Sequence, residues 1–223
     1  MGRRAVSGRE REDGMTQKER QERSREEIYG AALKEFGTQG YEGVRIEHIC
    51  ANHGISKGMM YHYFSSKDEL FLLCVERTFA ELKEYLDKKA GELPEGEALE
   101  TIKAYLMIRE DFFQGHAEQK LVFETAMVHP PRHLTEQIQA LRGPLRCMNR
   151  EFLTRQVDKM QLRPGMKREM VVRYLESVQT LFPKLAGYYE NKQEVTDLHG
   201  MLTSVGELLE MILLGVVRQP GAE

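Results

Sequence analysis

The fold of this chain is decided by one segment, Gly54-Ile55-Ser56-Lys57-Gly58-Met59-Met60-Tyr61-His62-Tyr63-Phe64-Ser65-Ser66-Lys67-Asp68-Glu69-Leu70. It places a glycine turn, a very short helix rich in aromatic and basic side chains, and the start of a second capped helix within 17 residues. So short a helix cannot bury three aromatic rings and a histidine at once. Some of these side chains must face outward, and exposed Tyr and His beside lysine are typical of a surface that binds nucleic acid.

The short helix is expected to have an inward and an outward side. Gly54 suits the left-handed residue that ends the preceding helix, and Ser56 is a good N-cap for the next one. Met60 and Phe64 are apolar and four residues apart, so they are expected to pack inward. The other side would present its N-terminal residues to base edges and its flanks to phosphates, as a recognition helix does. Its members are Gly58, Met59, Tyr61, His62 and Tyr63.

Two lysines strengthen this interpretation. Lys57 and Lys67 each stand at the first position of a helix, and Lys67 follows Ser66, which is expected to form a capping box with Glu69. A cation there opposes the helix dipole by roughly 0.3–1 kcal/mol, so helix stability alone does not select it. A helix N-terminus binds phosphate, and a lysine adds charge to that site. The alternative is that both are solvated surface lysines.

Two helices are expected upstream of the segment. The first has an apolar stripe at helical spacing, and Gly37 and Gly40 mark its end. The second is short and ends at the Gly54 turn. Together with the recognition helix they form a helix-turn-helix module of about fifty residues. The apolar positions are Ile28, Ala31, Ala32 and Phe36 in the first helix, and Ile46, Ile49 and Cys50 in the second.

Residues 25–70 resemble the DNA-binding domain of the TetR/AcrR family of bacterial transcriptional regulators. The resemblance is carried by Ile28…Ala32…Phe36, Gly40-Tyr41, Ile49-Cys50-Ala51, Gly54-Ile55-Ser56-Lys57-Gly58, Tyr61…Phe64 and Lys67…Leu70. It implies an Ω-shaped all-helical homodimer that binds double-stranded DNA at a palindromic operator, with a C-terminal domain that often binds a small-molecule effector. Carried over residue by residue, it assigns base and phosphate contacts to Lys57, Gly58, Tyr61, His62, Tyr63 and Lys67.

Two positions depart from the family pattern. Where the family often has Ser or Thr near the start of the second helix, this chain has Val44-Arg45-Ile46. Arg45 loses the helix cap but offers a longer-reaching phosphate contact. Where the family often has a small polar residue, Met59 cannot donate a hydrogen bond, so a contact with a thymine methyl group is expected instead. Both departures bear on the operator sequence rather than on DNA binding itself.

The charge of the chain sets how it can bind DNA. The 223 residues carry a formal net charge of −3, and residues 1–70 hold 12 basic and 12 acidic side chains. Binding therefore relies on the local placement of cations rather than on a broad positive field. Glu26, Glu27 and Glu35, all on the first helix, are expected to lie away from the duplex.

Cysteine usage and hydropathy predict a cytoplasmic protein, and the family resemblance implies that it is bacterial and associated with the nucleoid. Cys50, Cys74 and Cys147 are scattered and odd in number, which argues for a reducing compartment and against a disulfide framework or a zinc site. The apolar run at residues 211–217 is shorter than the roughly 18 residues of a membrane span. No metal and no cofactor are expected. Residues 1–16 are expected to form a disordered tail, with Met15 as an alternative start.

After the tail, the chain divides into two helical domains. Residues 17–66 form the helix-turn-helix domain, and residues 67–223 form an effector-binding and dimerisation domain. Pro and Gly breaks separate the helices of the second domain, and no β-hairpin signal or internal repeat is present, so the predicted fold is all-α. The expected helices cover about 67–89, 96–114, 117–128, 133–161 with a kink or break at Gly143-Pro144, 166–190 and 194–217.

The last two helices are apolar over a wider face than one intramolecular contact needs. We therefore expect them to form a four-helix bundle with a second copy of the chain. The alternative is that they only close the core of the protomer. The expected interface residues are Tyr174, Val178, Leu181, Leu202, Val205, Leu209, Ile212 and Leu213.

Met and Phe side chains in the second domain indicate where an effector would bind, because both adapt to irregular apolar ligands. The alternative is that these residues at helical spacing are ordinary core. The expected effector-pocket residues are Met107, Phe112, Phe113, Phe123, Met127, Met148 and Phe152.

Three hypotheses about function, each of a different class, follow from the sequence. The first is a ligand-responsive transcriptional repressor, whose sign of regulation rests on the resemblance. The second is a DNA-binding protein of the same fold with another role, such as chromosome organisation or the scaffolding of a protein partner. The third is an enzyme, which no Gly-rich phosphate loop, nucleophile elbow or metal cluster supports, so no catalytic activity is expected.

Overall fold

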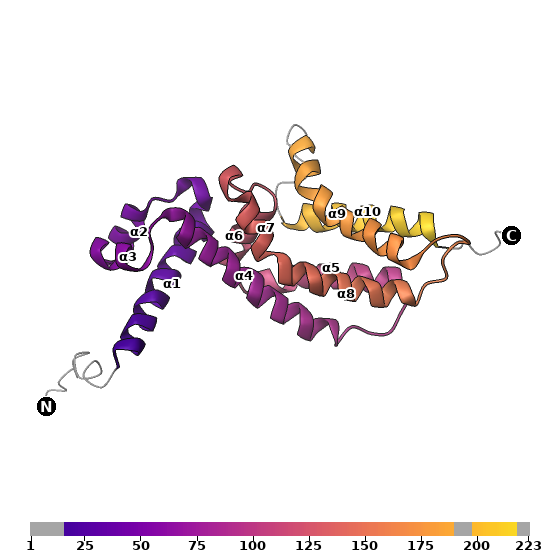
Figure 1. Cartoon of the computed structure of the whole chain (residues 1–223), viewed down its shortest axis with the longest axis horizontal. Helices are drawn as coiled ribbons and strands as arrows, with labels where there is room; N and C mark the ends of the chain where they lie inside the picture. The colour runs from indigo at the N-terminus through magenta and orange to yellow at the C-terminus, as the bar shows by residue number, and fades with distance from the viewer. Residues whose placement is uncertain (1–15, 190–197, 218–223) are drawn as a thin grey trace, which may run out of the picture.

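A computed structural model describes residues 16–189 and 198–217, with side chains for residues 16–178 and 198–217. The molecule is elongated, with three helices at one end, a helical bundle at the other and one long helix joining them (Figure 1). No strand occurs within the described ranges, where Leu162 and Val217 form an isolated bridge. This arrangement confirms the predicted all-α fold. The tail predicted for residues 1–16 lies outside the described residues, apart from Thr16.

The end of the molecule that contains the quoted segment is built from α1 (Gln17–Gly43), α2 (Ile46–His53) and α3 (Lys57–Tyr63). Thr16 caps α1 by accepting a hydrogen bond from the Glu19 amide at 3.3 Å, and the Glu19 carboxylate accepts one from the Thr16 amide at 2.7 Å. The predictions from sequence did not include this capping box. Gly40 has a φ of 66° and a ψ of 179°, so the regular helix is interrupted there, as the sequence predicts, and a short further piece continues to Gly43.

The turn between α2 and α3 has the geometry that the sequence predicts. Gly54 adopts a φ of 68° and a ψ of 19°, the left-handed conformation that favours glycine. The Ser56 hydroxyl accepts a hydrogen bond from the Met59 amide at 3.1 Å and so caps α3. Met60 and Phe64 are buried, which confirms the inward side of the recognition helix.

Helix α4 (Lys67–Ala90) joins the two ends of the molecule (Figure 1). Ser66 caps it by accepting a hydrogen bond from the Glu69 amide at 3.2 Å. The Glu69 carboxylate, however, bonds to the amide and hydroxyl of Ser65, at 2.7 and 2.9 Å, rather than to the amide of Ser66. Of the predicted capping box, only the bond from the Glu69 amide to Ser66 is therefore present.

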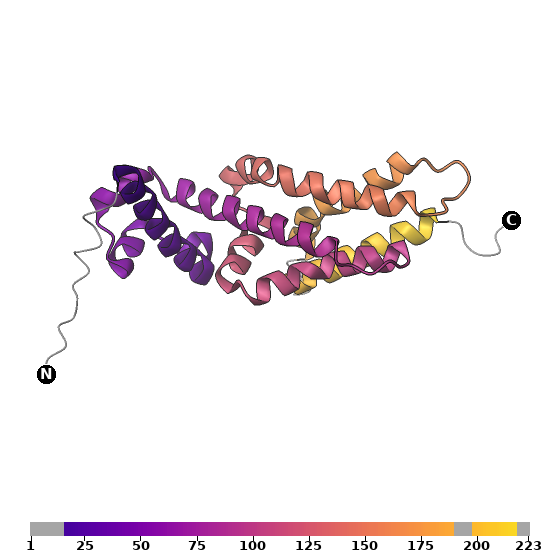
Figure 2. The ribbon, with the colours of Figure 1, turned by 90° about the horizontal axis from the view of Figure 1, so that it is seen from below.

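The helices between residues 98 and 158 pack against α4, and the last two helices pack against this layer in turn, as two perpendicular views show (Figures 1 and 2). The predicted segment 133–161 is broken at Arg142, because Pro144 lies in the first turn of a new helix, where its missing N–H costs little. The other predicted helices begin and end within about one turn of their expected limits. The elements are α5 (Ala98–Gln114), α6 (Ala117–Met127), the 3-10 helix η2 (Arg132–Leu134), α7 (Thr135–Leu141), α8 (Gly143–Asp158), α9 (Arg168–Tyr189) and α10 (Leu198–Val216).

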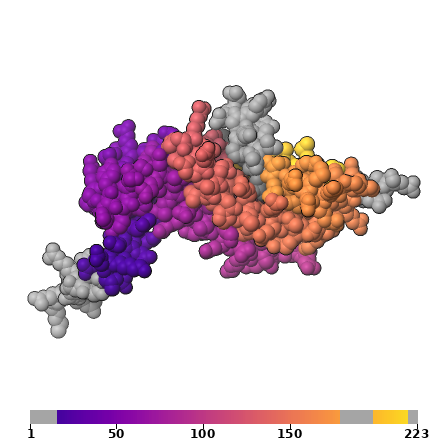
Figure 3. All heavy atoms as spheres, in the orientation of Figure 1, coloured from indigo at the N-terminus to yellow at the C-terminus, as the bar shows by residue number. Residues whose placement is uncertain are grey.

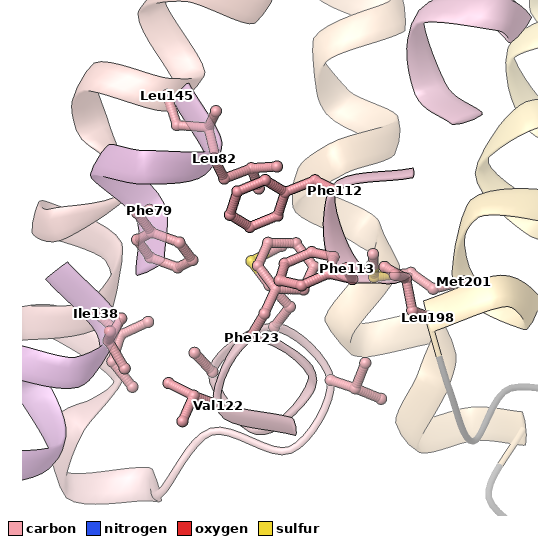
Figure 4. Close-up of a cluster of buried hydrophobic side chains, with 14 of the residues drawn as sticks. Phe79, Leu82, Phe112, Phe113, Val122, Phe123, Ile138, Leu145, Leu198 and Met201 are labelled. Atoms are coloured by element: carbon pink, nitrogen blue, oxygen red, sulfur yellow. The ribbon is translucent and has the colours of Figure 1, made fainter. Parts of the chain in front are cut away.

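Aromatic rings fill the centre of the bundle (Figure 4). The ring centroid of Phe123 on α6 lies 4.9 Å from that of Phe113 on α5 and 6.0 Å from that of Phe79 on α4. Phe112 and Phe113 are in edge-to-face contact, with centroids 4.9 Å apart. Contacts of this geometry stabilise a core beyond the area they bury. Helices α4, α5 and α6 are thus tied together by their aromatic side chains.

Helix α10 is apolar along most of its length. It has 19 residues and a mean hydropathy of 1.3, so by length and composition alone it qualifies as a membrane span. The prediction from sequence took only residues 211–217 into account and judged that run too short, which the length of the whole helix corrects. One third of the apolar window, 33%, is buried inside the protomer, where residues such as Leu202 and Leu209 contact the bundle. A helix that contributes to a protein core has the same composition.

Helices α1 and α6 approach closely where Gly37 faces Glu118. A Cβ atom added at Gly37 would lie 2.5 Å from the Cα atom of Glu118 and 2.7 Å from its carbonyl oxygen. These distances are well inside van der Waals contact, so only glycine permits this approach. A second link joins α1 to α4, because Arg77 donates to the Glu26 carboxylate at 2.7 Å and lies 4.1 Å over the ring of Tyr29. The N-terminal helices are therefore packed against the bundle through α1.

We expect Gly37→Ala to destabilise the protein by roughly 1–3 kcal/mol, because the added methyl group must push α6 away from α1. Gly30→Ala on the same helix is the matched control, since nothing lies within 4 Å of its Cβ position. There the substitution should stabilise by up to about 1 kcal/mol, because alanine has the higher helix propensity. Urea denaturation followed by circular dichroism measures both free energies of unfolding, and equal effects would contradict the close contact.

Candidate nucleic-acid interface

The outward side of α3 is open to solvent at one end of the molecule (Figure 3). Tyr61 is 51% exposed, and Lys57 and His62 are also exposed. The His62 ring meets the edge of the Tyr63 ring, with centroids 4.8 Å apart and an interplanar angle of 78°. A contact of this geometry favours one orientation of the exposed imidazole.

Gly58 has no internal reason to be glycine. A Cβ atom added there would meet nothing within 4 Å, and Gly58 is not among the described glycines with positive φ. Glycine nevertheless costs about 0.5–1 kcal/mol relative to alanine inside a helix. Its use is explained if the backbone of α3 has to come close to another surface, such as the base edges of a DNA major groove.

Three other predicted DNA contacts occupy less open positions or the neighbouring helix. Met59 and Tyr63 are half-buried and pack partly against the hydrophobic core, so each leaves only part of its side chain for an external contact. Arg45 is exposed at the N-cap of α2 and makes no side-chain capping bond. This agrees with the missing cap that the sequence indicates, and it leaves the guanidinium directed by no internal hydrogen bond at that helix end.

Lys67 is held by the protein itself. Its Nζ atom donates to the Tyr41 carbonyl oxygen at 3.0 Å and lies 4.0 Å from the centre of the Tyr41 ring. The sequence indicated Lys67 only as a cation at a helix N-terminus. Because an ammonium group has three donors, the bond to Tyr41 leaves two for a phosphate oxygen. The phosphate contact of Lys67 stays a prediction.

Tyr41 also joins the N-terminal helices to the bundle through a polar cluster. Its hydroxyl donates to the Asp68 carboxylate, and the Nε2 atom of His133 lies 3.2 Å from that hydroxyl and 3.1 Å from Asp68. The hydrogen bond from Tyr41 lowers the pKa of Asp68 from its ordinary value, and burial raises the pKa of Tyr41. Sequence spacing cannot reveal this cluster, because its three residues are distant along the chain.

Glu35 is buried and braces α1 against α2. Its carboxylate accepts a hydrogen bond from the Asn52 amide at 2.9 Å and lies 3.1 Å from the Nε2 atom of His53. The bond from Asn52, followed by that from His53, lowers the pKa of Glu35 from its ordinary value, although burial opposes the shift. The sequence placed this acid away from the duplex but did not show that it positions α2.

The comparison with known proteins agrees with this geometry. The family model of bacterial regulatory proteins of the tetR family matches residues 28–74, the part of the chain that includes α2 and α3. Residues 28–74 therefore form a tetR-family domain. The matched residues extend from the first buried turn of α1 into α4, and so include the glycine turn, both serine caps and the whole of the outward side of α3.

Curated relatives are similar over part of the chain. The HTH-type transcriptional repressor NicS of Pseudomonas putida is 30% identical over 125 residues, which cover 55% of this chain and 58% of NicS. The HTH-type transcriptional repressor AcnR of Corynebacterium glutamicum is 26% identical over 161 residues, which cover 70% of this chain and 77% of AcnR. The chain therefore matches little more than half the length of NicS.

Solved structures share the fold at low sequence identity. The transcriptional regulator FadR of Bacillus subtilis, in complex with stearoyl-CoA, has a TM-score of 0.58 and 16% identity, covering 82% of this chain and 96% of FadR. SmeT, the repressor of the Stenotrophomonas maltophilia multidrug efflux pump SmeDEF, has a TM-score of 0.59 and 22% identity, covering 89% of this chain and 94% of SmeT. These likenesses establish the helical TetR fold well beyond the N-terminal helices.

The helical bundle contains a cavity between α5, α6, α8 and α10. Phe123 and Met127, two of the predicted effector-pocket residues, line it. The other five predicted residues do not line this cavity. Helical spacing marks apolar residues but does not separate those that fill a core from those that border a space. Met107 is 37% exposed at the surface, and the buried residues that contact the core instead are Phe112, Phe113, Met148 and Phe152.

Polar residues that the predictions from sequence did not single out also line the cavity. They are Arg109, Arg142 and Asn149. The sequence did contain an indication that Arg109 is buried. It stands seven residues after Ile102 and three after Leu106, in line with the apolar stripe of α5. A charged residue at an apolar position of a helix requires a specific partner or function.

Some of the predicted dimer residues are accessible at the surface, and others are buried inside the protomer. Tyr174 is exposed and Ile212 half-buried, so both are accessible at the surface, whereas Leu181 lies outside the residues whose side chains are described. The other five serve the core of the protomer, and the interface assigned to them is corrected. Hydrophobic periodicity showed that the face of α10 is broad but not which part of it turns inward. These buried residues are Val178, Leu202, Val205, Leu209 and Leu213.

We expect Glu35 to contribute to stability in a pH-dependent way. Because folding lowers its pKa from the ordinary value of 4.5, the contribution is complete above about pH 4.5 and is lost as the pH falls through the folded-state pKa. Glu35→Gln should lower the free energy of unfolding at neutral pH by roughly 1–3 kcal/mol and by less in acid. The control is Glu27→Gln, at an exposed position of α1. Thermal unfolding over a pH series measures both, and a deficit of Glu35→Gln that does not change with pH would exclude the linkage.

Proposed function

We propose that the chain is a homodimeric transcriptional repressor that binds a palindromic operator in double-stranded DNA through α3 and leaves it when a small-molecule effector binds in the bundle. The observation that carries the proposal is the outward side of α3, where Gly58, Tyr61 and His62 project from a helix anchored in the core by Met60 and Phe64. The names of NicS and AcnR, both transcriptional repressors, support the same function.

The proposed DNA contacts divide into two kinds. His62 would bond to a base edge, and Gly58 would let the backbone of α3 approach the groove closely enough for that bond to form. The cations Arg45, Lys57 and Lys67 would pair with phosphates, which positions the helix without reading the sequence. Since residues 1–70 have no net charge, these few cations would have to supply most of the salt-dependent part of the affinity.

We expect His62→Ala to weaken operator binding by roughly 1–3 kcal/mol and to relax the base preference at one position of each half-site. Lys57→Ala should weaken binding to every sequence and flatten the salt dependence by about one unit of slope for each lysine–phosphate pair that the substitution removes. Neither substitution touches Met60 or Phe64, so the free energy of unfolding should stay the same. Lys88→Ala, at an exposed lysine near the far end of α4, is the matched control for the change in net charge.

DNA selected from a random library by the purified protein supplies the operator for these titrations. Binding of each variant to the operator and to a scrambled duplex, at several salt concentrations, separates base reading from phosphate contact. If both His62→Ala and Lys57→Ala bind the operator as tightly as the unaltered protein, α3 is not the reading helix. Occupancy of many dispersed genomic sites, rather than a few promoters, would favour a role in chromosome organisation.

The proposed dimer forms through the outward faces of α9 and α10, which pack against each other in the bundle (Figure 1). On α10, Met211 is 70% and Leu214 51% exposed, and on α9 Met170 and Tyr174 are exposed. Two neighbouring helices with apolar side chains on their outer faces suit a four-helix bundle formed with a second copy. A two-fold axis there would hold two copies of α3 at a fixed separation, which a palindromic operator requires.

We expect Met211→Asp to give a folded monomer, because it places a charge in the proposed interface but not in the protomer core. Leu209→Asp, two residues away on the buried face, should instead unfold or aggregate, since a carboxylate there has no partner. Light scattering gives the mass and circular dichroism the helix content of both variants. A wild-type protein that is monomeric at micromolar concentration, or a dimeric Met211→Asp, would disprove this interface.

Effector binding would reach the DNA through α6. The cavity has a volume of only about 50 Å³, so a ligand larger than a few atoms has to displace the helices that line it. Near the start of α6, Glu118 is in close contact with Gly37 of α1, so a displacement of α6 also moves α1. A ligand that favours this displaced state changes the separation of the two α3 helices. Because the operator fixes that separation, affinity for DNA falls.

A further inference from the structure

We propose that the cavity between α5, α6, α8 and α10 binds a small amphipathic carboxylate, whose charged group pairs with Arg109 and whose apolar part lies along Phe123 and Met127. The inference rests on the proposed function, because it takes this cavity to be the effector site. Its starting point is the burial of Arg109, which is only 5% exposed and lies among the apolar residues of α5. A buried guanidinium ordinarily has an acidic partner.

The acceptors around Arg109 are all neutral. Its Nη1 atom donates to the Tyr105 carbonyl oxygen at 2.9 Å and its Nη2 atom to the Asn149 amide oxygen at 2.9 Å. The guanidinium also lies 4.9 Å from the centre of the Tyr105 ring. Among the described residues no carboxylate pairs with it, and burial lowers its pKa from the ordinary value. The positive charge is thus solvated by dipoles but not neutralised.

The two acceptors that bond to Arg109 each have another hydrogen-bond donor. The Tyr105 carbonyl lies inside α5, where the helix supplies its own backbone hydrogen bond. The Asn149 amide oxygen also accepts a hydrogen bond from the Tyr105 hydroxyl at 2.7 Å. Removal of the guanidinium would therefore leave both acceptors bonded. Burial of this charge therefore lowers stability, and no internal hydrogen-bond acceptor depends on it. Features that lower stability without an internal benefit concentrate at functional sites.

The cavity carries a second buried cation. Arg142, at the junction of α7 and α8, is 8% exposed and lines the same space. Burial, and then the neighbouring charges of Arg109 and Arg146, lower the pKa of Arg142 to about 10. The charge of Arg142 adds to the positive potential that Arg109 creates in the cavity, which favours an anion over a cation. A neutral ligand would cover the guanidinium of Arg109 without compensating its charge.

The rest of the lining suits the apolar part of such a ligand. Leu106, Phe123 and Val205 border the cavity together with Met127 and Met201. Methionine side chains are flexible and can open a space that is small when empty. A linear or aromatic carboxylate has the required form, with one planar anionic group that two N–H donors of an arginine can bind side by side and one apolar end.

The test uses calorimetric titration of the full-length protein with octanoate and phenylbutyrate, each compared with its primary amide. The amide keeps the shape and loses the charge. We expect each acid to bind roughly tenfold to a hundredfold more tightly than its amide, as a charge-assisted bond predicts, and Arg109→Met to abolish the difference. Arg132→Met, which removes an exposed arginine of η2 that does not line the cavity, is the matched control and should keep the preference.

Arg109→Met should melt no lower than the unaltered protein, because it leaves no acceptor unbonded. If it does not fold, the comparison of acid with amide in the unaltered protein decides the question. Equal affinity for acid and amide, a preference that survives in a folded Arg109→Met, or no binding of either acid at millimolar concentration would overturn the inference. Calorimetry needs no DNA, so a protein that prefers the acids but binds no operator would refute the repressor and leave the carboxylate site standing.

Discussion

The close contact between Gly37 of α1 and Glu118 of α6 is the constraint on which the rest of the structure depends. Helix α1 provides one wall of the helix-turn-helix core, and α6 brings Phe123 and Met127 to the cavity of the bundle. No side chain separates the two helices at Gly37, so there is no flexible group to absorb a displacement of one against the other. The Tyr41–Asp68–His133 cluster and the Arg77–Glu26 pair add polar links at neighbouring points.

The same packing holds α3 in a fixed direction. Buried Met60 and Phe64 fix its rotation, and Glu35 holds α2 behind it through Asn52 and His53. A recognition surface built on such a rigid base loses little conformational entropy when it meets a duplex, which raises affinity without adding contacts. It also means that a shift of α1 would move the whole of α3 as a unit rather than loosen it.

Two features of the chain oppose ordinary stability and for that reason indicate function. Gly58 weakens an exposed helix without relieving any internal clash, and Arg109 places a charge in a core whose acceptors are satisfied without it. The proposed partners would explain both, a duplex in the first case and an anionic ligand in the second. The two sites lie at opposite ends of the path through α1 and α6, so the contact at Gly37 would connect them.

The sequence alone determined the features whose physical causes are local. The glycine turn at Gly54, the serine caps and the spacing of Met60 and Phe64 act within a few residues, so the helix-turn-helix, the inward side of α3 and the all-α fold could be predicted from them. Tertiary structure decided that Lys67 is held by Tyr41, that Leu209 of α10 turns inward while Met211 turns outward, and that Arg109 rather than Phe112 borders the cavity. These outcomes depend on helices that are far apart in the chain, and periodicity shows that a helix face is apolar but not which surface it will meet.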